Sequence, residues 1–163
     1  MLDTHGDRIF VGSSDHMQIE ELNASGDTVR ILRIPDYPLA LTAEQVRAER
    51  DARLGLPLQP GASPRPPFIV DAVEDMPSPE TRPAYADMRV DPTGAIWLRA
   101  FRGMSEGSGP EPWLVLGPDG NWLGSVEIPE NFRVTDIGLD EILGVWEDEL
   151  DVQHPQVRRL DRG

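Results

Sequence analysis

Hydrophobic residues in this chain gather in short runs that turn-forming residues separate. In the first 35 residues such runs cover positions 8–12, 17–22 and 28–34. Asn, Ser, Gly and Asp cluster between the second and third runs, and Pro35 ends the third because proline cannot donate a ladder hydrogen bond. Runs of this length with such boundaries predict β-strands.

The second half repeats this pattern. The predicted strands are residues 87–90, 95–101, 113–116, 122–128, 132–137, 142–146 and 157–160. Tight turns are predicted at 91–94 and 118–121, where Asp, Pro, Gly and Asn are concentrated.

The middle of the chain differs, because its spacing predicts a helix over residues 43–54. Thr42 and Gln45 form a capping box at its start, and Gly55 is a natural stop. The apolar face of this helix is thin, so we expect it to lie on the surface. A Pro-rich connection follows from 57 to 83, with a short strand predicted at 68–70.

An internal repeat relates the two halves. Residues 22–35 align without gaps to residues 116–129, with Gly26 over Gly120 and a terminal Ile-Pro in both copies. Each copy reads as strand, tight turn, strand and proline stop. Repeated units of this kind are typical of radial β architectures.

Residues 113–116 and 142–146 are apolar on both faces, whereas residues 122–128 carry polar residues on one side. Continuous apolar strands predict sheets that are packed on both sides. The fold class we predict is all-β, a partial β-propeller of about two and a half four-stranded blades with one short surface helix. A β-sandwich is the alternative.

The same pattern divides the chain within one structural domain. We expect a partial blade at 1–35, a helix-containing Pro-rich insertion at 36–84, a complete blade at 85–131 and a final, incomplete blade at 132–163.

Four segments carry a resemblance to a known family: PETRPAY (79–85), MRVDPTGAIWL (88–98), GPDGNWLG (117–124) and ILGVWEDELDV (142–152). In their order and spacing they resemble a bacterial family of six-bladed β-propellers related to NHL-repeat propellers. The resemblance implies that the chain corresponds to the C-terminal half of such a protein. It also implies an extracytoplasmic location for the full-length protein, although residues 1–8 show no signal-peptide pattern.

The chain departs from this family in completeness. Only residues 1–5 precede Gly6, so the first blade is expected to lack its innermost strand, and the last blade has at most three strands. We therefore expect a fragment of a longer protein, or a chain that closes by self-association. Expressed alone, it would expose strand edges and an apolar face, and we expect concentration-dependent association.

The formal net charge of −14 argues against nucleic acid and anionic membrane surfaces as partners. No apolar run approaches the roughly 20 residues of a membrane span, so no membrane insertion is expected. The chain has no Cys, which leaves the compartment unknown from redox usage. An unknown protein or small molecule remains as the expected ligand.

Catalytic patterns are absent from the sequence. His5, His16 and His154 have no metal-ligand spacing, and the acidic run 147–149 with Asp151 is interpreted as a charged hairpin loop. Asp91 and Asp119 are assigned to turns. There is no nucleophile elbow and no phosphate-binding glycine motif.

Aromatic and basic residues offer the remaining candidates. Four aromatic side chains could stack on a sugar and two arginines could bind an anion, but packing between blades is the expected role of the aromatics. They are Tyr85, Trp97, Phe101 and Trp113, with Arg99 and Arg102.

We therefore expect a non-enzymatic binding or scaffold propeller, with no catalytic, cofactor-binding or metal-binding residue assigned and the ligand-binding residues unknown. One alternative is a propeller-type lyase or hydrolase whose metal ligands lie largely in other blades. The other is a non-functional gene remnant.

Overall fold

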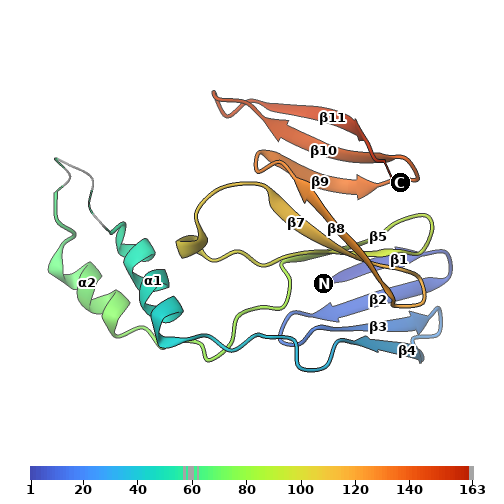
Figure 1. The fold of residues 1–163 in the computed structure, drawn as a ribbon, viewed down its shortest axis with the longest axis horizontal. Helices are drawn as coiled ribbons and strands as arrows, with labels where there is room; N and C mark the ends of the chain where they lie inside the picture. The colour runs from blue at the N-terminus through green and yellow to red at the C-terminus, as the bar shows by residue number, and fades with distance from the viewer. Residues whose placement is uncertain (57, 59–60, 62, 162–163) are drawn as a thin grey trace.

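A computed structural model describes residues 1–56, 58, 61 and 63–161 of the chain. It is mostly β, with three antiparallel sheets and two short helices (Figure 1). The first sheet has the order β1-β2-β3-β4, from β1 (Leu2–His5), β2 (Arg8–Ser13), β3 (Gln18–Asn23) and β4 (Thr28–Arg33).

The expectation that the first sheet lacks an inner strand is wrong. Residues Leu2–His5 pair antiparallel with β2, with Leu2 opposite Val11 and His5 opposite Arg8. The segment is short and half polar, so its pattern alone does not mark a strand. Its partners come from tertiary structure: the Asp3 carboxylate accepts a 2.7 Å hydrogen bond from the Val90 N–H, 87 residues away.

The middle sheet has the order β5-β6-β7-β8, from β5 (Asp87–Val90), β6 (Ile96–Arg99), β7 (Glu111–Leu116) and β8 (Trp122–Ile128). The third sheet has three strands, β9 (Phe132–Ile137), β10 (Glu141–Glu147) and β11 (Gln153–Arg159), with β10 in the centre. The last strand is thus longer than the predicted 157–160 and starts earlier.

Two hydrophobic cores lie between the three sheets, one on each face of the middle sheet. One holds Phe10 and Ile19 of the first sheet with Leu98 of the middle sheet, and the other holds Trp113 of the middle sheet with Phe132 of the third. The middle sheet is therefore packed on both faces, as its continuous apolar strands predict. A β-sandwich has a single core between two sheets, which is not the arrangement of the described residues.

The internal repeat is visible in the backbone. Gly26 and Gly120 occupy equivalent turns with φ of 85° and 87°, a conformation that glycine adopts without steric cost. The register shifts at the same column in both copies, since Leu22 pairs with Thr28 and Leu116 pairs with Trp122. Two segments that align in sequence thus fold into the same bulged hairpin.

The first strands of the sheets lie next to one another, because β5 contacts both β1 and β9. Tyr85, just before β5, is fully buried and its hydroxyl donates to the carbonyls of Ser13 and Gln18 at 3.2 and 3.0 Å. This tyrosine fixes the middle sheet to the β2–β3 loop of the first.

The segment between the first two sheets is helical. Helix α1 (Ala43–Leu54) has the predicted capping box of Thr42 and Gln45, and Gly55 ends it in the left-handed conformation. The predicted strand at 68–70 is wrong, because helix α2 (Pro67–Glu74) covers it. Pro67 at the first helical position favours a helix start and outweighs the strand preference of Ile69 and Val70. Within the Pro-rich connection, positions 57, 59, 60 and 62 lie outside the described residues.

The helical segment leaves and rejoins the sheets at one place. Ala40 and Thr81 form an isolated antiparallel bridge, and two backbone hydrogen bonds flank it, Leu41 N to Glu80 O at 3.0 Å and Arg82 N to Leu39 O at 2.8 Å. We call residues 41–80 the helical insertion. In Figure 1 its helices project to one side of the sheets.

Candidate functional site

Three of the four candidate aromatics lie in the cores. Tyr85, Trp97 and Trp113 are at most 2% exposed, so none offers a ring face for a ligand. Burial raises the pKa of Tyr85 to about 12, so its hydroxyl stays a neutral donor. The Trp97 indole N–H donates to Asp91 at 2.9 Å. The expectation that these aromatics pack between sheets is confirmed.

The two candidate arginines have partners within the chain. Arg99 lies 3.2 Å from the Glu111 carboxylate. Arg102 donates to the carbonyls of Gly109 and Pro110 in the β6–β7 loop. They stabilise this end of the middle sheet and give no sign of a free anion site.

The histidines and the acidic run do not form a metal site. No group of three or more His, Cys, Asp or Glu able to hold a metal ion occurs among the residues that the structure describes. His5 and His154 lie in strands, whereas His16 lies in the loop expected for it. His154 contacts Asp148 at 2.9 Å, and this hydrogen bond, followed by those from the N–H groups of Val152 and Leu150, lowers the pKa of Asp148.

Asp91 and Asp119 accept hydrogen bonds from backbone N–H groups of their own turns, as predicted. The carboxylate of Asp91 is fully buried and accepts hydrogen bonds from the Thr93 hydroxyl and N–H and from the Ala95 N–H. Asp119 accepts from the Asn121 N–H at 3.2 Å in the exposed turn.

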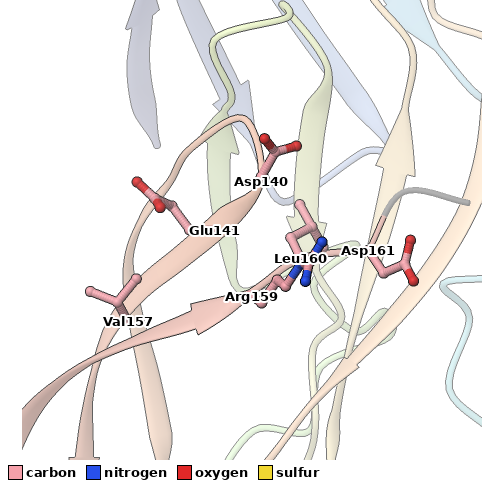
Figure 2. Close-up of a pocket in the computed structure, with 6 residues that line it drawn as sticks. All are labelled: Asp140, Glu141, Val157, Arg159, Leu160 and Asp161. Atoms are coloured by element: carbon pink, nitrogen blue, oxygen red, sulfur yellow. The ribbon is translucent and has the colours of Figure 1, made fainter.

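One open pocket lies at the end of the third sheet, with a volume of about 610 Å³. Its lining residues are Asp140, Glu141, Val157, Arg159, Leu160 and Asp161. Figure 2 shows Glu141 and Asp161 on opposite sides of Leu160, with their carboxylates directed away from each other. The carboxylates of Glu141 and Asp161 therefore do not converge on one point.

A second cavity, also of about 610 Å³, lies between the helical insertion and the middle sheet. Helix α1 forms one wall, the residues after α2 form another, and the β6–β7 loop with its short helix η1 (Met104–Glu106) forms the third. We call it the insertion cleft. Its apolar lining is Leu41, Val46, Ala48, Val73, Met76, Pro77, Pro79, Pro83 and Phe101.

Glu49 joins α1 to η1 across the cleft. Its carboxylate oxygens accept from the N–H groups of Met104 and Ser105, each at 3.1 Å. Burial acts to raise the pKa of Glu49, but the hydrogen bonds from Ser105 and Met104 outweigh it and the pKa is lowered below 4.5. The charged carboxylate is therefore the form that ties the two elements together.

Arginines connect the other walls. Arg50 donates to the Ser78 hydroxyl at 2.6 Å and to the Met76 carbonyl at 3.2 Å, which joins α1 to the residues after α2. Arg82 forms a 2.8 Å ion pair with Glu106 and also donates to the Phe101 carbonyl. Its guanidinium lies 5.6 Å from the centre of the Phe101 ring. Glu49, Arg50 and Arg82 thus all have hydrogen-bond or ion-pair partners within the walls.

Helix α2 adds an exposed apolar surface next to the cleft. None of its residues is buried, and Phe68 is 72% exposed although most of the helix is apolar. Met104 on η1 is 62% exposed. Apolar surface of this kind, next to an apolar cavity, is typical of binding regions.

Sequence reasoning identified Phe101 as a candidate but not the cleft around it. The cleft depends on α2, which was predicted as a strand, and on long-range contacts such as Glu49 to Met104. The apolar run Phe68–Ile69–Val70 following two prolines was the one available signal.

No described helix has the length and hydrophobicity to cross a bilayer. Comparisons of the chain with models of protein families, with curated proteins and with solved structures found no match.

Proposed function

We propose that the three sheets are blades of a β-propeller and that the chain is a non-enzymatic binding module whose ligand enters the insertion cleft. The radial arrangement is supported by the neighbouring first strands β1, β5 and β9 and by one core between each pair of successive sheets. In a propeller the loops at one rim present ligand sites on a rigid scaffold.

The observation that carries the binding function is the apolar lining of the insertion cleft. Glu49, Arg50 and Arg82 already have partners in the walls, so a ligand would meet mainly aliphatic and aromatic surface. Ligand sites of similar volume have this composition, with a few polar groups at their edges.

The ligand class that fits is an apolar side chain or segment of a protein partner. The exposed Phe68 and Met104 extend the apolar surface beyond the cleft, more than a small enclosed ligand would need. Aromatic residues and methionine are enriched at protein interfaces. The helical insertion would then be the recognition element, and the sheets its support.

A fluorescence titration with 8-anilinonaphthalene-1-sulfonate, an apolar dye, tests the cleft. Val73 lines the cleft, whereas its neighbour Ala72 is exposed and does not. We expect Val73→Glu to weaken a saturable dye site by about tenfold or more, because it places a charge in an apolar site. Ala72→Glu, the matched control, should leave the affinity within about twofold.

Equal dye affinity of the two variants and the unchanged chain would contradict the proposal. Dye bound elsewhere on the sheets would appear as a component that Val73→Glu does not affect. Circular dichroism of both variants shows whether α2 is retained.

A further inference from the structure

The first and third sheets each turn one apolar face away from the middle sheet. Phe10 and Ile19 point into the core, so their alternating neighbours lie on the opposite face of the first sheet. This first outer face contains Leu2, Ile9, Val11, Leu22 and Ile31. Leu2 is 65% exposed and Ile31 is 50% exposed.

The first outer face repeats a pattern that is buried in the middle sheet. Ile9 pairs with Leu22 as Ile96 pairs with Leu116, and Leu22 and Leu116 are equivalent in the internal repeat. Ile96 and Leu116 are at most 5% exposed because they pack against the first sheet. The first sheet thus presents the kind of surface that receives a preceding sheet.

The third sheet presents the opposite kind of surface. Its inner face, with Phe132 and Ile142, packs on the middle sheet. Its second outer face contains Leu143, Val145, Pro155 and Val157, with Leu143 opposite Val157 and Val145 opposite Pro155. Val157 is 66% exposed. This is the side on which a following sheet would continue the stack.

Charged residues of both signs lie on the two outer faces. Glu20 and Arg33 lie on the first, and the second carries Arg133 and Arg159 with Asp136, Glu141 and Glu147. A chain of net charge −14 repels its copies over most of its surface. Together these two faces carry three positive and four negative side chains, a net charge of −1, so two copies repel each other much less there than over the rest of the surface.

We infer that a second copy of this chain covers both outer faces, the second outer face of each copy packing on the first outer face of the other. The contact is head-to-tail and continues the sheet-to-sheet packing already present within the chain. Two copies bring six sheets together, within the four to eight blades of closed propellers.

Sedimentation equilibrium of the full chain over a wide concentration range tests this ring. We expect a reversible dimer of twice the 18.1 kDa chain mass. Its affinity should rise when salt is raised to about 0.3 M, because screening weakens the repulsion between acidic copies. A monomer at every concentration would overturn the inference, as would an open polymer that grows with concentration.

Three variants at exposed strand positions locate the contact. Ile31→Glu and Val157→Glu each place a charge on one outer face, and each should weaken the dimer by about tenfold or more. Leu123 is 63% exposed on β8 and lies on neither outer face, so Leu123→Glu is the matched control and should dimerise normally. Circular dichroism verifies the fold of each monomer.

Mixing the two weakened variants distinguishes a head-to-tail contact from a symmetric one. Ile31→Glu retains an intact second outer face and Val157→Glu an intact first outer face, so the mixture should form a heterodimer through one intact contact. A dimer lost in only one of the two variants, or lost in neither, would overturn the head-to-tail arrangement.

Discussion

The middle sheet and the helical insertion are held in place by different kinds of interaction. Both faces of the middle sheet pack in hydrophobic cores, and Met88, Ile96 and Leu98 are fully buried. In the helical insertion Leu54 is buried, whereas α2 has no buried residue. Polar contacts of Arg50 join α1 to the residues after α2, and those of Glu49 join α1 to η1 of the middle sheet's β6–β7 loop.

This difference explains why the insertion cleft lies between the helical insertion and the middle sheet and not inside the sheets. Close packing leaves no room for a ligand inside the sheets, because cores have few voids larger than a water molecule. Polar contacts at the surface instead hold walls apart while leaving apolar surface between them. The sheets supply rigidity, and the insertion supplies accessible surface.

The largest effect should come from removing the buried carboxylate of the middle sheet. Asp91→Ala removes the carboxylate that accepts hydrogen bonds from the buried Ala95 N–H and the Trp97 indole N–H. We expect a loss of about 3 kcal/mol in the free energy of unfolding, measured by urea denaturation. Asp119→Ala, in the exposed turn between β7 and β8, should cost less than about 1 kcal/mol. Similar losses of unfolding free energy in both variants would contradict the view that the buried carboxylate contributes more to stability than the exposed one.

The contact between the first two sheets should be nearly as sensitive. A Cβ at Gly12 would overlap the Tyr85 hydroxyl. We expect Gly12→Ala to destabilise the chain by about 2 kcal/mol, because packed side chains cannot move aside. The clash is with the hydroxyl, so Gly12→Ala should cost less in a Tyr85→Phe background. A double-mutant cycle measures this coupling, and additive losses would show that the two residues do not interact.

The sequence predicts most of the sheets because their strands carry local signals. The repeated turns, the proline stops and the doubly apolar strands identify β4 and β7 to β10 directly. The sequence does not predict the strand β1, because its four residues carry no clear strand pattern of their own. Its contacts are made across a tight turn with β2, where Leu2 pairs with Val11, and with Val90, which is 87 residues from Asp3. The helix α2 was missed because β-branched residues favour strands, whereas the preceding prolines and the contact with α1 favour a helix.

The candidate site was less predictable for the same reason. In the sequence, Phe101 lies in a predicted strand, as do Trp97 and Trp113. Of these three aromatic residues, Phe101 alone lines the cleft, because it lies beyond the end of β6. The cleft itself depends on contacts between α1 and a loop 55 residues away. No local pattern contains such a contact.

A smaller, pH-dependent effect should be confined to the insertion. The folded-state pKa of Glu49 is lowered, so its contribution to stability is present above pH 4.5 and is lost as the pH falls through the folded pKa. We expect amide exchange of Met104 and Ser105, measured by NMR and corrected for intrinsic rates, to accelerate over this range. In Glu49→Gln the exchange should already be faster and vary little with pH. Unchanged protection in that variant would show that Glu49 does not hold η1.

Native-state hydrogen exchange tests the contrast between the two regions most directly. We expect amides of β6 and β7 to exchange only through global unfolding, and amides of α1 and α2 to exchange through a local opening of clearly lower free energy. Protection of α1 and α2 equal to that of β6 and β7 would contradict the account, because the insertion would then be as rigidly packed as the sheets.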